Sequence, residues 1–151
     1  MQAAALALWC ISLAACSSQR AAPAAGPDAA LQAIPASDAT QYEPIQDMKK
    51  WRNPYLIVRA DDVALLDTAD SAEIMLKPDE LLPALARLPA SDWPYGRVVA
   101  AAVTTATASV PAAKDRSSAS DQQAVAIRRN KGIVGGLLQG AHVAIKWVPS
   151  S

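Results

Sequence analysis

The most reactive side chains in this sequence are two thiols, Cys10 and Cys16, and one imidazole, His142. Both thiols lie in or directly after an apolar run from Ala3 to Ala15, and the polar Ser17 follows at once. The run has roughly 13 uncharged positions, fewer than the roughly 18 to 20 that a bilayer-spanning helix needs. It therefore fits the apolar region of a secretory signal peptide.

Residues Leu13, Ala14, Ala15 and Cys16 resemble the lipobox of bacterial lipoproteins, in which a leucine and two small residues precede a lipid-modified cysteine. The resemblance implies that residues 1–15 are removed as a signal peptide and that Cys16 is acylated on its sulfur and on its new amino group. Serine after the cysteine resembles the sorting preference for the outer membrane in enterobacteria. We therefore expect a lipid anchor in the cell envelope, facing the periplasm. An ordinary cleaved signal and a buried apolar helix are the alternatives.

Lipid processing at Cys16 would leave no free thiol for a disulfide, a metal site or a nucleophile, because Cys10 would leave with the signal. His142 has no partner carboxylate or nucleophile near it in sequence, which favours a structural or exposed role. The sequence also lacks the spacings of zinc, calcium, phosphate-loop and nucleophile-elbow motifs. We expect no catalytic residue, no metal and no cofactor.

Opposite charges separate along the chain, although 14 basic and 14 acidic residues give a net charge of +0. Acidic residues crowd positions 61–92, and basic residues dominate from 97 to 146. Arg128, Arg129 and Lys131 form a candidate patch for an anionic envelope component or an acidic envelope protein; two solvated faces are the alternative. No aromatic residues interleave with these basic ones, and we expect no nucleic-acid partner.

The composition divides the chain near Met48. Residues 16–47 are rich in Ala and Pro and predict a flexible tether that starts at the lipidated cysteine. A short helix formed by "DAALQAI" and docked on the domain is the alternative. Most aromatic residues follow, so residues 48–151 predict one small domain, with a flexible loop near 104–120.

Within this domain, strands are predicted at 54–61, 63–67, 97–103 and 142–148, and "AEIMLKPDE" predicts a strand that enters a helix over 79–88. Pro83 fits that helix only in its first turn. A second helix is predicted over 121–139, with Ser120 and Gln123 as a capping box and Gly140 as its end. Its predicted inner face is formed by Ile127, Val134 and Leu138, with Val125, Ile133 and Leu137 beside them. Gly132, Gly135 and Gly136 predict close packing of this helix on the sheet; a hinge or a backbone contact with a ligand is the alternative.

This order of elements predicts the α+β class, a two-layer sandwich with two helices packed on a small mixed sheet. Four segments carry this layout: "YLIVRADDVALLD", "LKPDELLPALARL", "RVVAAAV" and "AHVAIKWV". Their order resembles the periplasmic domain of the ExbD/TolR family, whose members are accessory subunits of proton-driven motors. That family carries a membrane helix with an essential Asp, and no residue here inherits its proton-carrying role. We expect a non-catalytic, membrane-anchored interaction or accessory module. An ExbD/TolR-like accessory domain of a transport or motor complex is the alternative, and a periplasmic enzyme is the third hypothesis.

Overall fold

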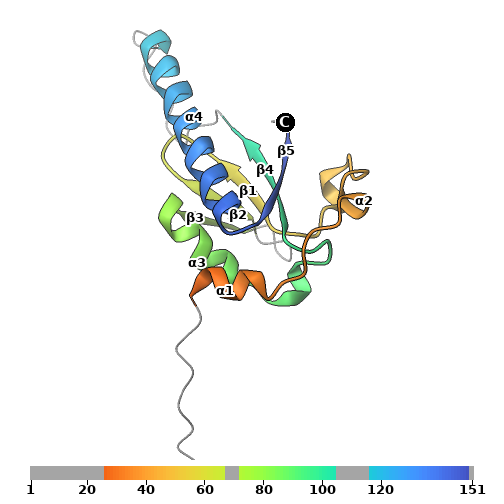
Figure 1. Ribbon diagram of the computed structural model, residues 1–151. Coiled ribbons are helices and arrows are strands. Elements are labelled where there is room, and N and C mark those ends of the chain that lie inside the picture. The colour runs from red at the N-terminus through yellow and green to blue at the C-terminus, as the bar shows by residue number, and fades with distance from the viewer. Residues whose placement is uncertain (1–25, 67–71, 105–115, 150–151) are drawn as a thin grey trace, which may run out of the picture.

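The strands in the described part of the chain form one open sheet of five, in the order β3-β2-β1-β4-β5 (Figure 1). The computed structural model describes residues 26–66, 72–104 and 116–149. β1 (Tyr55–Val58), β2 (Val63–Leu66) and β3 (Glu73–Leu76) pair antiparallel, and β4 (Val98–Val103) and β5 (Ala144–Val148) extend the sheet parallel to β1. The predicted α+β class with a small mixed sheet is confirmed.

The helices that connect these strands cover one face of the sheet. α3 (Leu81–Ala86) follows the short helix η2 (Pro78–Glu80), and α4 (Arg116–Gly140) lies between β4 and β5. Side chains alternate along a strand, so every second strand residue points toward the helices. The main core contains strand and helix residues that are fully or almost fully buried: Leu56, Val58, Val63, Leu65, Val99, Ala101, Leu81, Leu85, Val134 and Leu138.

Pro83 lies inside α3 without breaking it. The helix begins at Leu81, after Glu80 as its N-terminal flanking residue, so Pro83 is its third residue. The first backbone N–H groups of a helix have no intrahelical acceptor, and a proline there loses no hydrogen bond. The predicted late start of this helix is confirmed, and Leu81 and Leu85 are its buried residues.

The segment before residue 48 differs from the predicted flexible tether. α1 (Pro27–Gln32) contacts α3, and Leu31 and Ile34 belong to the main core, with Leu31 0% exposed. These two residues lie three positions apart, on one side of a helical turn, so together they bury an apolar surface that the Ala- and Pro-rich composition conceals. This arrangement corresponds to the alternative of a short docked helix. Residues 16–25 of the predicted tether lie outside the described residues.

The other face of the sheet is covered near one end by the chain from α2 (Ala39–Tyr42) through η1 (Met48–Lys50) to Trp51. Trp51 packs with Val98 and Ala100 of β4. Lys146 on β5 fixes this segment, because its Nζ donates to the carbonyl oxygens of Tyr42 at 2.8 Å, Glu43 at 3.0 Å and Ile45 at 2.7 Å. A lysine close to a helix C-terminus satisfies carbonyls that have no partner within the helix.

α4 is longer than predicted. It begins at Arg116 rather than Asp121, so Ser120 lies inside the helix and the predicted capping box does not start it. Of the predicted loop 104–120, residues 105–115 lie outside the described residues.

Asn130 is buried on α4, and its Nδ2 donates to the carbonyls of Arg59 at 3.0 Å and Ala60 at 2.8 Å. This pair of bonds seats the middle of α4 over the β1–β2 turn, and the N-terminal part of the helix extends beyond the sheet (Figure 1).

The glycines of α4 do not pack against the sheet, and this prediction is wrong. A Cβ atom added to Gly132, Gly135 or Gly136 would have no neighbouring atom within 4 Å. The buried side of α4 is carried instead by Ile127, Asn130, Val134 and Leu138, at helical spacing. Val125 and Ile133, predicted beside the inner face, are 60% and 42% exposed.

α4 ends at Gly140, where the sequence predicts its end, but Gly140 does not take the left-handed conformation that closes the helix. His142 adopts φ 58°, and Val143 N donates to Leu138 O at 2.8 Å while His142 N donates to Gln139 O at 3.0 Å. These two bonds are those of a Schellman motif with His142 at its left-handed position. The chain therefore ends the helix with a residue that has a Cβ atom where glycine is preferred.

Replacing His142 with glycine is expected to raise the free energy of unfolding by about 1 kcal/mol, because glycine removes the steric cost of the left-handed conformation. Urea unfolding followed by circular dichroism measures the change. His142→Ala is the control, since alanine keeps the Cβ atom and is expected to give no such gain. A loss of stability in His142→Gly would show that the imidazole makes a stabilising contact and would contradict this assignment.

Candidate functional site

The predicted lipid-attachment residues, Leu13 to Cys16, lie outside the described residues. The first described residue is Gly26, next to α1. Gly26 lies ten positions after Cys16, and ten residues span at most about 35 Å. The α1 end of the molecule lies opposite the free N-terminal end of α4 (Figure 1). A lipid on Cys16 would therefore hold the α1 end near a membrane surface.

The predicted basic patch is divided between different sides of α4. Consecutive residues of a helix are about 100° apart, so Arg128 and Lys131 are neighbours while Arg129 points elsewhere. Lys131 leans toward the sheet, and its Nζ lies 4.4 Å from the ring centroid of Trp147 on β5. Because the ammonium group of Lys131 interacts with a ring of its own chain, it is less available to a partner. Arg128 and Arg129 are exposed, and they are the two residues of the patch that are left for a partner.

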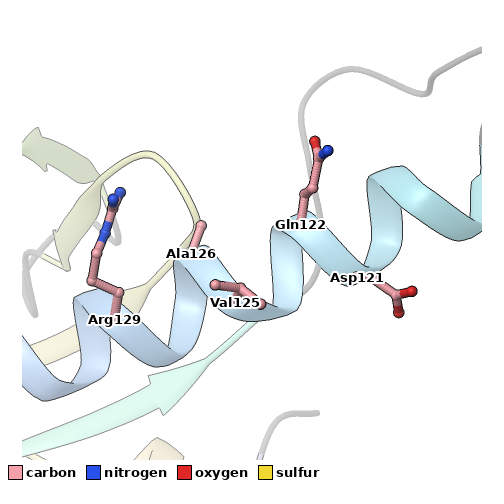
Figure 2. Close-up of a pocket in the computed structure, with 5 residues that line it drawn as sticks. All are labelled: Asp121, Gln122, Val125, Ala126 and Arg129. Atoms are coloured by element: carbon pink, nitrogen blue, oxygen red, sulfur yellow. The ribbon is translucent and has the colours of Figure 1, made fainter.

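A hollow of about 350 Å³ lies beside α4, on the N-terminal side of Asn130. Among the described residues, Asp121, Gln122, Val125, Ala126 and Arg129 line it, and Figure 2 shows these side chains along one helix. Asp121, Val125 and Arg129 follow one another at intervals of four residues, so an exposed apolar side chain lies between an acidic and a basic one. Of the predicted site residues, this surface includes Arg129.

Sequence reasoning missed this surface because it placed Val125 beside the inner face of α4. The signal that could have identified it is the interval of four residues between Asp121, Val125 and Arg129. A helix cannot bury Ile127 and Val134 and also turn Val125 inward, because Val125 lies on nearly the opposite side from these residues.

Ionic contacts of Arg59 hold the edge of the sheet. Its Nη2 donates to Glu73 Oε2 on β3, its Nη1 donates to Met75 Sδ at 3.1 Å, and Asp62 lies 3.7 Å away. The hydrogen bond that Arg59 donates to Glu73 and the charges of the two nearby carboxylates raise the pKa of Arg59 above its ordinary value. The arginine is charged in any case, so these contacts fix β3 to the β1–β2 turn and do not prepare a group for proton transfer.

No cluster of three or more His, Cys, Asp or Glu side chains suited to a metal ion occurs among residues 26–66, 72–104 and 116–149. Comparisons with protein-family models, with curated proteins and with solved structures give no match. Over the same stretches of chain, no helix combines the length and the apolar character needed to cross a membrane.

Proposed function

We propose that this protein is a lipid-anchored module of the bacterial cell envelope, held on the outer membrane and facing the periplasm, that binds another envelope component and does not catalyse a reaction. The observation that carries the proposal is the sequence Leu13-Ala14-Ala15-Cys16, which follows an uncharged apolar run and lies ten positions before Gly26, the first described residue. Several acyl chains on one residue, each favourable by ~0.8 kcal/mol per buried methylene, give a persistent anchor.

The placement of the two ends of the fold supports an interaction role. An anchor on Cys16 holds the α1 end near the membrane, and the free end of α4 then points away from it (Figure 1). Exposed Val125, Arg128 and Arg129 lie between this end of α4 and Asn130. An acidic protein surface or an anionic envelope component such as lipid A or peptidoglycan carboxylates is the partner class that two exposed guanidinium groups favour.

Replacing Cys16 with alanine is expected to move the protein from the membrane pellet to the soluble envelope fraction, because the sulfur that carries the acyl chains is removed. Fractionation of cells grown with labelled palmitate measures location and acylation together. Cys10→Ala is the matched control: it lies in the signal segment, and pellet and label should stay unchanged. A Cys16→Ala protein that stays in the pellet and keeps its label would reject the proposal.

An ExbD/TolR-like accessory domain is the second candidate, and the order of the elements favours it: a three-stranded meander, a helix, a strand, a long helix and a last strand. It differs from the first candidate in its partners. A transport or motor accessory domain would copurify with integral proteins of the inner membrane after detergent extraction. Copurification with outer-membrane components alone would favour the first candidate.

A further inference from the structure

The charges around the hollow on α4 are complementary to the same charges on a second, antiparallel copy of the helix. Along its axis the order is Asp121, Val125 and Arg129, with Val125 midway between the two charges. A second helix that runs antiparallel, related by a two-fold axis at Val125, places its Arg129 against Asp121 and its Asp121 against Arg129. Both ion pairs form at once because an interface of this symmetry uses the same surface twice.

We propose that α4 binds α4 of a second copy of this chain in this antiparallel arrangement, with Val125 packed against Val125 at the two-fold axis. Val125 is the most exposed of the large apolar side chains in the described part of the chain, at 60%, and pairing would remove it from water. Ala126 beside it is small enough to let two helices approach to the usual 8–10 Å between axes. Val125 lies on the side of α4 opposite the buried Ile127 and Val134, so it faces away from the core.

Within the hollow, a second copy fits better than the anionic partner of the proposed function. An acidic surface would pair with Arg129 but would repel Asp121, eight positions away on the same helix, whereas the antiparallel copy satisfies both charges. Exposed Arg128 does not line the hollow, so it stays available to an anionic envelope partner. The contact covers only a few helical turns, so we expect it to bury less surface than the roughly 1,200–2,000 Å² that stable complexes bury. The association is therefore weak and concentration-dependent, and anchoring of both copies to one membrane would strengthen it by raising their effective concentration.

A single cysteine at the symmetry axis tests the arrangement. In the purified full-length chain, Val125→Cys is expected to form an oxidant-induced disulfide with its own copy, because the two side chains meet at the axis. Gln139→Cys is the matched control, since it is also exposed on α4 but would lie about 40 Å from its symmetry mate in the pair. The unsubstituted chain measures any cross-linking through Cys10 and Cys16. We expect at least about fivefold more dimer for Val125→Cys than for Gln139→Cys.

Charge exchange tests the ion pairs in the Val125→Cys background. Asp121→Arg alone and Arg129→Asp alone should each lower the cross-linked fraction by about fivefold, because each brings like charges together twice. The double exchange should restore it, since the opposite charges meet again. Asp121 and Arg129 are eight positions apart on one helix and do not pair within a chain, so restoration would report an intermolecular contact.

Three results would overturn the inference. Equal cross-linking of Val125→Cys and Gln139→Cys would show that this surface does not contact the same surface of a second copy. A double exchange as weak as the single ones would show that these charges do not pair across the interface. An adduct of Val125→Cys with a different envelope protein, formed in cells in place of the dimer, would assign the surface to that partner. The purified chain is tested without regard to its lipid, so a failure here is distinct from a failure of the Cys16→Ala experiment.

Discussion

Replacing Gly96 with alanine is expected to lower the free energy of unfolding by about 3 kcal/mol or more. Gly96 has φ 75°, a conformation that side chains with a Cβ atom rarely adopt. An added Cβ would also lie 2.5 Å from the carbonyl oxygen of Ala36 and 2.9 Å from that of Pro35. Both atoms belong to the backbone, so neither can move aside without displacing the chain that follows α1.

The same substitution should loosen the N-terminal segment before it unfolds the sheet. Arg97 N donates to Pro35 O at 2.8 Å, and this bond ties the segment after α1 to the turn before β4. Limited proteolysis should therefore cut Gly96→Ala between residues 26 and 50 faster than the parent chain, and urea unfolding gives the stability change. Gly136→Ala is the control, because its Cβ meets open space on a helix and should stabilise the chain by about 1 kcal/mol. A cost below about 1 kcal/mol for Gly96→Ala would contradict the close approach.

Replacing Asn53 with leucine should also cost about 3 kcal/mol, since it removes three hydrogen bonds from backbone groups of the turn before β4. Asn53 is 0% exposed; its Nδ2 donates to the carbonyls of Gly96 and Val98, both at 2.7 Å, and its Oδ1 accepts from Tyr95 N at 3.0 Å. One side chain thus satisfies the turn that leads into β4. Leucine has a similar size but neither donates nor accepts.

Urea unfolding of Asn53→Leu beside Arg52→Leu measures this effect. Arg52 is the exposed neighbour, and its replacement should change the free energy of unfolding by less than about 0.5 kcal/mol. Similar losses in the two variants would indicate that the amide of Asn53 contributes little to the turn.

The parts of the fold that the sequence predicts well are those whose signal is local. The run at 97–103 is a buried strand because its apolar residues have no interruption, and α3 is marked by Pro78 and by leucines at helical spacing. β1 and β2 follow from short apolar runs separated by the polar "RADD" turn. In each case nearby residues carry the whole pattern.

The parts that the sequence does not predict depend on contacts between distant residues. Leu31 and Ile34 look isolated in an Ala- and Pro-rich segment until α3 is placed beside them. The three α4 glycines suggest close packing only while the side of the helix that meets the sheet is unknown. Asn53 and Lys146 gain their roles from carbonyls that lie more than forty positions away in the chain.

The candidate surface on α4 follows the same division. The presence of charged residues near 128 is visible in the sequence, but their distribution around the helix depends on which side is buried. Asn130 decides this by bonding to the β1–β2 turn, which turns Val125 and Arg129 outward and brings Lys131 to Trp147. Once that one long-range contact is known, the other positions follow from helical geometry.

Mass spectrometry of the N-terminal peptide from the native cell tests the lipid anchor most directly. Our account predicts a chain that begins at Cys16, lacks residues 1–15, and carries acyl chains on its sulfur and on its amino group. A peptide that contains residues 1–16 intact, with an unmodified Cys16, would contradict it.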